Sequence, residues 1–444
     1  MHNPSPDPAD KSADDELKQD VQDTNDLQSA NLPGVRMNTA SAQQQTGAML
    51  FSHIQAAPDD PILGLKKKFL ADQNPDKVDL SAGVYKDDQG KTTKLQSVSQ
   101  AESAIQAKTA GGYLPIDGDP TYKEKVQELI FGSGSSILKD KRVASVQSVG
   151  GTSALFYGAR FIKKYLPDAG IHISNPTWAN HKGVFQSEGL AISEYPYYDT
   201  QKNEVDFDAM LSSVKALADG SVVLLHGCCH NPTGMDLNAK QWDELVDHFK
   251  SGRLLPFIDF AYQGFAEGIE QDASAIRKFA DAGIPFMVAN SFSKNFSLYN
   301  RRVGALHIVG ETEQETQAIL SQLKRVVRTS NSNPPIDGAL IAAEILSDQN
   351  LRQTWEGELE SMRLRIKDMR KLLVDGMAAR GAGDAFSHVG LQNGMFSYSG
   401  LNPQQVAELQ DKYSIYAVGS GRICVASLTS SNIEYVMDAL AAVV

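Results

Sequence analysis

Short apolar runs alternate with stretches of helical periodicity between about Val143 and Val309. Three of these runs are continuous, with no polar residue at every second position: Val222–His226 (VVLLH), Pro256–Phe260 (PFIDF) and Phe286–Ser291 (FMVANS). Continuous apolar runs are typical of strands that are buried on both faces of a parallel sheet. Because helical stretches separate them, the pattern predicts an α/β domain whose sheet is mostly parallel and flanked by helices.

Two other stretches repeat apolar residues every three or four positions. One is Ser153–Leu166, and the other is the much longer Leu351–Met377. At under four heptads, the longer pattern favours a helix packed on its own chain over a coiled coil. From there to Val444, glycine and serine turns separate short strands, and a final helix closes the chain, which predicts a smaller α+β domain.

The first 48 residues differ from the rest of the chain. They hold eight acidic and three basic residues, a net charge of −5, and almost no aromatic residues. Such a segment cannot bury enough apolar surface to fold alone, so we expect a disordered tail. It has no apolar core of a signal peptide, and its acidity is the opposite of a mitochondrial transit peptide. Whether translation starts at Met1 or Met49 is left open.

Composition excludes several classes of partner. The 444 residues carry a net charge of −12 and have a pI near 5.3, which argues against nucleic acid or anionic membranes as partners. No apolar run approaches the length of a membrane span. The three cysteines, Cys228, Cys229 and Cys424, cannot build a disulfide framework and fit a reducing cytoplasm.

Candidate chemistry begins where the apolar run of Phe286–Ser291 ends. Ser293 and Lys294 follow directly, and Arg302 comes eight positions after the lysine. A desolvated lysine loses its proton readily and becomes a nucleophile able to form a Schiff base. Neighbouring hydroxyls and an arginine suit a phosphate. The stretch therefore predicts a phosphate-bearing aldehyde on Lys294, which is pyridoxal phosphate, although a solvated surface lysine is the common alternative.

Asp259 and Tyr262 stand at the end of another predicted strand. In a doubly wound sheet the ligand crevice lies beyond the carboxyl ends of the strands, where Lys294 is also expected. A pyridine cofactor needs a carboxylate at its ring nitrogen, and Asp259 is suited to that role. Tyr262 is placed to donate to the ring's phenolic oxygen. The alternative for Asp259 is an ordinary helix N-cap.

Two further segments offer anion-binding groups. Gly150–Thr152 precedes a predicted helix, so its backbone N–H groups and the helix dipole could bind a phosphate, although a tight turn is the usual explanation of such glycines. Arg422 leads into a short apolar strand. It either extends its charged end to solvent or grips a substrate carboxylate with two hydrogen bonds.

The segment His226–Gly234 (HGCCHNPTG) invites a zinc interpretation. Its spacing matches none of the usual structural zinc patterns, so we predict no metal. Asn-Pro-Thr-Gly is a turn by composition. Its functional interpretation is that Asn231 bonds the oxygen of the cofactor ring.

Together these segments resemble a class I pyridoxal-phosphate aminotransferase of the aspartate/aromatic aminotransferase subgroup, which has fold-type I. The resemblance extends from Phe51 to Val444. It includes the following motifs: GYLPIDG (112–118), GGTSAL (150–155), NPTWANH (175–181), HGCCHNPTG (226–234), DFAYQGFAEG (259–268), SFSKNFSLYNRRVG (291–304), NGMFSYSG (393–400) and GRICVA (421–426). Two departures are Asn331, where many relatives have tyrosine, and Arg301, where glutamate is common.

The resemblance implies a domain division and a role for each site residue. Residues 49–92 would form an N-terminal arm and part of the small domain, 93–350 the large cofactor-binding domain, and 351–444 the linking helix and the small C-terminal domain. Lys294, Asp259 and Tyr262 would be catalytic. The cofactor would also contact Gly151, Thr152, Trp178, Asn231, Ser291, Ser293, Arg302, Tyr113 and, behind Asp259, His181. The substrate would contact Gly83, Trp178, Asn231, Arg328 and Arg422.

Three further expectations follow from the resemblance. Tyr113 and Arg328 would reach into the site of a neighbouring subunit, so the protein would be a homodimer with shared sites. The peptide bonds before Pro176 and Pro232 would be cis. Two arginines across the pocket suit dicarboxylates, so we predict ping-pong transfer of the amino group of aspartate to 2-oxoglutarate in the cytoplasm.

Alternatives to this reaction remain open. Gly112 and the YLPIDG motif favour relatives that also accept phenylalanine and tyrosine, so aromatic donors are the first alternative. Another pyridoxal-phosphate enzyme of the same fold, such as a decarboxylase or a β-lyase, is a weaker one. A non-catalytic regulator on this fold could dispense with Lys294 and Asp259, yet both are present.

Overall fold

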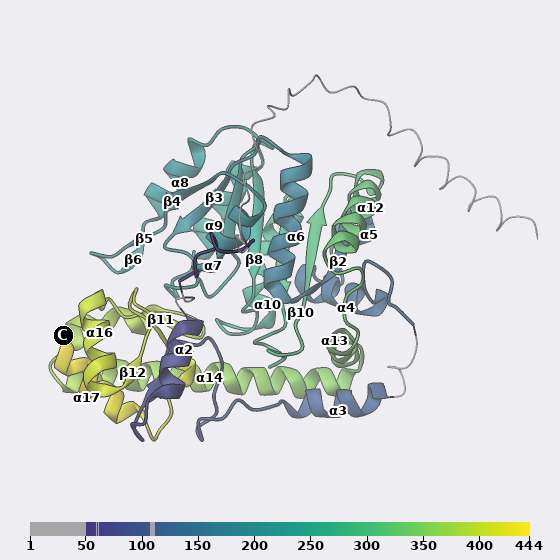
Figure 1. Ribbon diagram of the computed structural model, residues 1–444. Helices are drawn as coiled ribbons and strands as arrows, with labels where there is room; N and C mark the ends of the chain where they lie inside the picture. Colours follow the sequence, from purple (N-terminus) through teal and green to yellow (C-terminus); the bar gives the residue numbers. More distant parts are fainter. Residues whose placement is uncertain (1–49, 59, 61, 107–111) are drawn as a thin grey trace, which may run out of the picture. The chain divides into compact units, whose positions relative to one another are not determined.

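The computed structural model describes residues 50–58, 60, 62–106 and 112–444, and Figure 1 colours these parts along the chain. The tail predicted for residues 1–48 lies outside the described residues, as does Met49. The described residues fall into two compact units, one up to Pro58 and the other from Asp60 onward. The first is a short turn in which the N–H of Ile54 donates to the carbonyl of Phe51 at 3.0 Å. All that follows concerns the second unit.

A seven-stranded sheet forms the centre of the second unit. Its strands run in the order β2 (Val143–Val149), β10 (Val303–Val309), β9 (Phe286–Ser291), β8 (Leu255–Phe260), β7 (Val222–His226), β3 (Ile171–Asn175) and β4 (Ile192–Pro196). Neighbours are parallel from β9 to β4, whereas β10 is antiparallel to both β2 and β9. The mostly parallel α/β sheet is confirmed, and the three continuous apolar runs are its central strands β7, β8 and β9.

The continuous apolar runs arise because helices cover both faces of the sheet. Val222 and Leu224 belong to a core cluster with α6 (Gly150–Tyr165), α7 (Asn180–Ser187) and α12 (Glu313–Ser330). Val223 and Leu225 point to the other core cluster, which includes α4 (Pro120–Phe131), α8 (Phe207–Lys215), α9 (Ala239–Phe249) and α11 (Ser274–Asp281). Burial of each such side chain contributes about 1.5–3 kcal/mol, so apolar residues are favoured on both faces of these strands.

The helix predicted at Ser153–Leu166 begins three residues earlier than expected. Gly150 has φ +80°, and this left-handed conformation turns the chain from the end of β2 straight into α6. Sequence reasoning offered these glycines either as part of a phosphate-binding helix N-terminus or as a tight turn. The structure uses Gly150 as the turn and Gly151 as the first turn of the helix.

The long helix predicted at Leu351–Met377 is α14 (Gln349–Ala379). Asp348 caps it, accepting hydrogen bonds from the N–H groups of Asn350 and Leu351. Trp355, Leu359 and the apolar residues spaced along the same stripe are buried within the second unit, so the helix packs on its own chain as expected. It lies against α3 (Gln96–Ile105), α13 (Asp337–Ser347), α15 (Gly383–Phe386) and α17 (Ile433–Val443).

Short elements complete the part of the chain after α14. The strand β11 (Phe396–Tyr398) pairs with β13 (Arg422–Cys424) in an antiparallel pair, and α16 (Pro403–Tyr413) precedes β12 (Ile415–Tyr416). β12 in turn pairs with β1 (Val78–Asp79) from the start of the unit, beside α2 (Leu63–Ala71). Smaller elements are α5 (Ser136–Lys139), α10 (Ile269–Asp272), β5 (Tyr198–Asp199), β6 (Glu204–Val205), and the 3-10 turns η2 (Ser387–Leu391) and η3 (Val425–Ser427). The division of the unit into a large and a small domain stays a prediction.

Candidate active site

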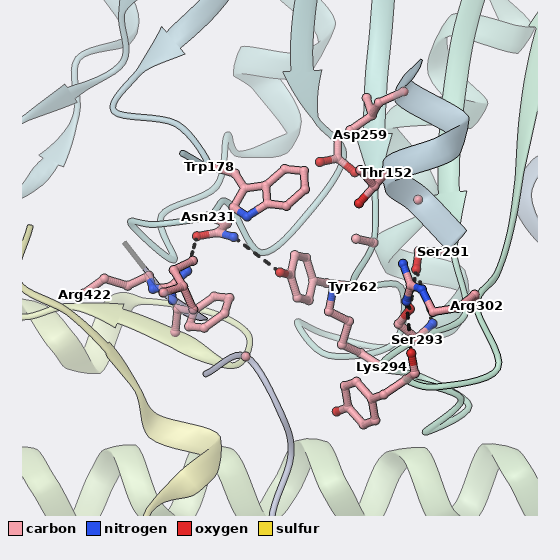
Figure 2. Close-up of a pocket in the computed structure, with 17 residues that line it drawn as sticks. Thr152, Trp178, Asn231, Asp259, Tyr262, Ser291, Ser293, Lys294, Arg302 and Arg422 are labelled. Carbon is pink, nitrogen blue, oxygen red and sulfur yellow. Dashed lines mark hydrogen bonds between the residues drawn. The ribbon is translucent and has the colours of Figure 1, made fainter. Parts of the chain in front are cut away.

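The predicted site residues meet in a cavity beyond the carboxyl ends of the central strands. Asp259, in β8, pairs in register with Ala289 of β9 and with His226 of β7, so the ends of these strands lie at one edge of the sheet. The cavity measures about 280 Å³. It is lined by these predicted residues: Gly83, Gly151, Thr152, Trp178, Asn231, Asp259, Tyr262, Ser291, Ser293, Lys294, Arg302 and Arg422 (Figure 2).

One side of the cavity is a cradle of hydrogen-bond donors. Nη1 of Arg302 donates to Oγ of Ser293 at 3.1 Å, and Oγ of Ser291 donates to Oγ of Ser293 at 3.1 Å. The N-terminus of α6 has no side-chain cap, so its first N–H groups stay available. A Cβ on Gly150 would come within 2.5 Å of Nη2 of Arg302. The cradle therefore suits a phosphate, which would find hydroxyls, a guanidinium and a helix dipole together.

Lys294 lies beside this cradle, on the turn after β9. Its Nζ stands 4.8 Å from the centre of the Tyr262 ring. Burial lowers the pKa of Lys294 from its ordinary value to about 8, and the charges of Arg302 and Arg422 act in the same direction, whereas Asp259 opposes the shift. The amine is therefore neutral in a much larger fraction of molecules at physiological pH than a surface lysine.

Asp259 is held from behind by a histidine. Nε2 of His181, on α7, lies 3.0 Å from Oδ2 of Asp259. Burial by itself would raise the pKa of Asp259, but the hydrogen bond with His181 and the nearby charges hold this pKa below its ordinary value. The carboxylate thus stays anionic at neutral pH. The N-cap alternative does not hold, because the residues after β8 form a loop and α10 begins only at Ile269.

The opposite side of the cavity is built around Arg422. Its Nη1 donates to Oδ1 of Asn231 at 3.1 Å and its Nη2 to the carbonyl of Ser81 at 2.6 Å, while Nε is buried without a hydrogen-bond partner among the described residues. The guanidinium also lies 4.1 Å from the ring centre of Phe396. The Arg422 side chain does not extend to solvent, since it is 4% exposed. An unpaired donor of a buried arginine is the group expected to bind a carboxylate.

Asn231 and Tyr262 complete that side. Nδ2 of Asn231 donates to Oη of Tyr262 at 3.5 Å, and burial raises the pKa of Tyr262 far above its ordinary value, so the phenol stays protonated. The peptide bonds before Pro176 and Pro232 are cis, as expected. Trp178 faces the cavity on the same side as Asn231 (Figure 2).

Three predicted residues do not line the cavity of this chain. His181 lies behind two lining residues: it bonds Asp259 and packs edge-to-face on Trp178 at 5.2 Å. Tyr113 is 94% exposed, and Arg328 is an exposed residue of α12 whose Nη1 donates to Oγ of Ser332. The last two are the residues that the resemblance assigned to a neighbouring subunit.

Sequence reasoning missed five residues that line the cavity: Ile62, Leu155, Ala261, Tyr299 and Phe396. Two of them carried a usable signal. Tyr299 lies five positions after Lys294 in the same motif, and Phe396 lies in the motif NGMFSYSG. The other three are aliphatic residues whose types resemble those of any core position, so their types give no sign of a site even though Leu155 and Ala261 lie in the motifs GGTSAL and DFAYQGFAEG.

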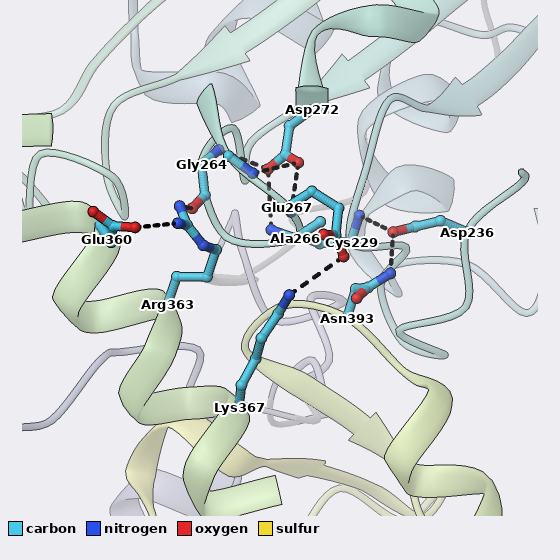
Figure 3. A network of polar contacts seen from close by, with 11 residues as sticks. Cys229, Asp236, Gly264, Ala266, Glu267, Asp272, Glu360, Arg363, Lys367 and Asn393 are labelled. Atoms are coloured by element: carbon cyan, nitrogen blue, oxygen red, sulfur yellow. Dashed lines mark hydrogen bonds and ion pairs between the residues drawn. The ribbon is translucent and has the colours of Figure 1, made fainter. Parts of the chain in front are cut away.

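The cysteines of the loop after β7 do not form a metal site with their neighbours. Sγ of Cys228 and Cys229 and a carboxylate oxygen of Asp272 lie within 4.8 Å of one another. The two oxygens of Asp272 already accept four backbone N–H groups, those of Gly264, Ala266, Glu267 and Gly268, the first three of which Figure 3 labels. The carboxylate is thereby used to fold the loop that follows Tyr262, and it has no lone pair left for an ion.

Comparison with known proteins places these observations in a family. The family model "Aminotransferase class I and II" matches residues 75–440. The aspartate aminotransferase of Pseudomonas aeruginosa is 49% identical over 392 residues, covering 88% of this chain and 98% of its own. The aromatic-amino-acid aminotransferase of Escherichia coli is 44% identical over 396 residues, covering 89% and 100%.

Solved structures give the same result. The crystal structure of an aromatic-amino-acid aminotransferase from Burkholderia pseudomallei, covalently bound to pyridoxal phosphate, has 48% sequence identity and a TM-score of 0.87. It covers 89% of this chain and 100% of its own. The chain therefore belongs to the class I and II aminotransferases. Within the described residues, moreover, none of the helices combines the length and apolarity needed to cross a membrane.

Proposed function

We propose that this chain is a pyridoxal-phosphate-dependent transaminase. The observation that carries the proposal is the order of groups across one cavity. The anion cradle of Ser291, Ser293 and Arg302 lies on one side, Lys294 stands next to it, and the unpaired Nε of Arg422 lies on the other. A compound with a phosphate at one end and an aldehyde near Lys294 fits the first two groups, and an amino acid carboxylate fits the third.

Each residue has a distinct task in this proposal. The phosphate would be held by Ser291, Ser293, Arg302 and the N-terminus of α6, and the amine of Lys294 would condense with the aldehyde, whose oxygen leaves as water. When bound, the cofactor's protonated ring withdraws electrons from the reacting carbon of the substrate. The anionic Asp259 keeps the ring nitrogen protonated, and Asn231 and Tyr262 bond the ring oxygen. Arg422 would orient the substrate carboxylate, and the amine of Lys294, released when the substrate amine displaces it from the aldehyde carbon, would take a proton from the reacting carbon and return it.

Replacement of Lys294 tests this assignment directly. We expect Lys294→Ala to fold and to bind the cofactor without the covalent bond, and to lose transamination by at least about 10⁴-fold, since nucleophile and proton-transfer group are removed together. The readouts are the absorbance spectrum, the thermal midpoint and keto-acid-dependent amino transfer. Turnover at the wild-type rate in this variant would contradict the assignment.

The preferred donor is proposed to be aspartate, with 2-oxoglutarate as acceptor. Relatives at 49% and 47% identity are named aspartate aminotransferases, whereas others at 48%, 44% and 43% are named for aromatic amino acids, so aromatic donors remain the alternative. Measurement of kcat/KM for aspartate, phenylalanine and tyrosine separates the two. A tenfold preference for an aromatic donor, about 1.4 kcal/mol in transition-state binding, would reverse the order.

We further propose that the protein is a cytoplasmic homodimer whose sites combine residues of both subunits. The exposure of Tyr113 and Arg328 supports this proposal, because the family resemblance assigns both residues to the site and neither lines the cavity of its own chain. Mixing two inactive variants tests it. In a hybrid of Lys294→Ala with Arg328→Ala, one site carries both defects and the other carries neither, so activity should return on mixing. No recovery, with subunit exchange verified by mass, would contradict shared sites.

A further inference from the structure

Asp236 organises the loop that follows β7. The backbone N–H of Cys229 donates to its Oδ2 at 2.9 Å, and that of His230 donates to its Oδ1 at 2.9 Å. Cys229 has φ +50°, a left-handed conformation that residues with a Cβ rarely adopt. Successive N–H groups next to a left-handed residue form a concavity that binds an anion. Here the anion is the carboxylate of Asp236, six or seven residues further along the same chain.

The same carboxylate reaches a second loop. Nδ2 of Asn393 donates to Oδ2 of Asp236 at 3.4 Å, and the backbone N–H of Asn393 donates to the carbonyl of Gly234 at 2.6 Å. Figure 3 shows Asp236 between Cys229 and Asn393. The two loops are in close contact there, since a Cβ on Gly394 would come within 2.5 Å of the Cβ of Cys229. Asp236 therefore joins two loops, and its partner Asn393 lies 157 residues away in the sequence.

Both loops deliver a residue to Arg422. The first carries Asn231, whose Oδ1 accepts from Nη1 of Arg422, and the second leads into β11 with Phe396, which packs under the same guanidinium. Asp236 does not line the cavity. It acts one layer behind the residues that hold the arginine, where a carboxylate has no contact with a substrate.

We propose that Asp236 is a positioning residue of the active site: by accepting N–H groups from Cys229, His230 and Asn393, its carboxylate fixes Asn231 and Phe396 around Arg422. The inference rests on the proposed function only for its effect on catalysis. The order of the two loops depends on Asp236 whatever the cavity binds. Among the described residues, each group that hydrogen-bonds to this carboxylate is a donor, so an anionic acceptor is what the arrangement needs.

Burial and hydrogen bonding act in opposite directions on the pKa of Asp236. Burial raises the pKa of Asp236 to about 6, while the N–H groups of His230 and Cys229 oppose that shift. The other titratable or charged groups near it are Tyr197, Cys228, Cys229, Asp272 and Arg370. As the pH falls through about 6, the carboxylate gains a proton and loses acceptor capacity. Because its pKa in the folded protein lies above the ordinary value, proton uptake here favours the folded state globally, so we expect the loosening to be local.

Hydrogen exchange of the holoenzyme at the loop, measured by mass spectrometry, tests the proposal. In Asp236→Asn the new NH₂ group faces the N–H donors. We expect exchange protection of residues 226–235 to fall at least tenfold at pH 8 and the KM for the amino acid to rise about tenfold. The matched control is Asp199→Asn, because Asp199 also accepts two backbone N–H groups, those of Gln201 and Lys202, in a turn away from the cavity. It should leave both quantities unchanged.

The outcomes decide between a positioning role and a merely structural one. Wild-type protection and wild-type KM in Asp236→Asn would overturn the proposal, and so would a lower thermal midpoint with unchanged KM. If this variant does not fold, the pH dependence of hydrogen exchange in the wild-type protein tests the proposal instead. After correction for intrinsic exchange, protection of residues 226–235 should fall between pH 7 and pH 5 while that of the turn at Gln201 stays constant, and equal behaviour of the two segments would overturn the proposal. If exchange protection of residues 226–235 depends on Asp236 but the protein shows no transaminase activity, only the proposed function is contradicted and the positioning role of Asp236 stands.

Discussion

Nε2 of His181 lies 3.0 Å from Oδ2 of Asp259, and this contact decides the charge of the carboxylate. Burial works to raise the pKa of Asp259, and the hydrogen bond with His181 is the largest effect that lowers it. The lowered pKa means that the anionic form is favoured above the ordinary pKa and is lost only as the pH falls through the folded value. The proposed mechanism places this carboxylate against the protonated ring nitrogen of the cofactor, and the lowered pKa keeps the carboxylate anionic at neutral pH.

Removal of His181 should therefore shift the activity profile toward alkaline pH. A hydrogen bond to a charged group contributes about 1.5–3 kcal/mol. In His181→Phe the largest effect that opposes burial is removed, and only the weaker charges of His226 and Lys294 remain, so we expect the acid limb of kcat/KM to move to higher pH. The pH dependence of kcat/KM from pH 5 to 9 measures it. His248→Phe, a histidine on α9 away from the cavity, is the control, and identical profiles for wild type and His181→Phe would contradict the explanation.

Lys294 should be unusually reactive in the cofactor-free protein. Burial and the nearby arginines lower its pKa to about 8, so the neutral amine increases as the pH rises through 8 and saturates above it. We expect the rate of cofactor rebinding, followed by absorbance, to rise with a midpoint near 8. A midpoint near the ordinary value of 10.5 would show that the amine is not desolvated. Lys294→Ala, which lacks the amine, gives the background.

The central sheet and the cavity differ in how much the sequence reveals. The runs that became β7, β8 and β9 were evident because two-sided burial leaves no polar alternation. Lys294, Asp259 and Arg422 were predicted because each is a charged residue beside an apolar run, although each alone had an ordinary alternative and only their combination indicated one site. Asp236 carried no such signal: an aspartate after Asn-Pro-Thr-Gly-Met is an ordinary turn residue, and its partner Asn393 lies in a segment that only the fold brings near. Ile62 and Leu155 were missed for the same reason.

Gly264 should resist substitution because α14 packs directly on it. The residue has φ +95°, and a Cβ there would come within 2.3 Å of Cδ2 of the buried Leu359. The left-handed conformation costs about 1–2 kcal/mol for a residue with a Cβ, and overpacking adds about 1–3 kcal/mol. We expect Gly264→Ala to lower the free energy of unfolding in urea by about 2–5 kcal/mol.

Two further variants test whether the contact with Leu359 causes the loss of stability. Gly357→Ala is the matched control, because Gly357 lies inside α14 and a Cβ added there would meet no atom of the described residues within 4 Å, so it should raise stability by about 0.5–1 kcal/mol. The double variant Gly264→Ala/Leu359→Ala removes the clash, so its loss should be smaller than the sum of the two single losses. Strict additivity would show that the contact with Leu359 is not the cause.

Tyr122 offers the opposite case, a substitution that should stabilise the protein. Its ring is fully buried and packs edge-to-face on Phe292 at 5.9 Å, while its hydroxyl has no hydrogen-bond partner among the described residues. A buried hydroxyl without a partner costs about 1–3 kcal/mol. Tyr122→Phe keeps the ring and removes that cost, so we expect the free energy of unfolding to rise by about 1–3 kcal/mol.

Tyr157 is the matched control, since it is also buried but its hydroxyl donates to Oδ1 of Asn331 at 2.9 Å. Tyr157→Phe should lose about 0.5–1.5 kcal/mol. Urea unfolding of both variants at one protein concentration tests the pair, and the same sign of change in both would show that the hydroxyl of Tyr122 is not the unsatisfied group that the structure indicates.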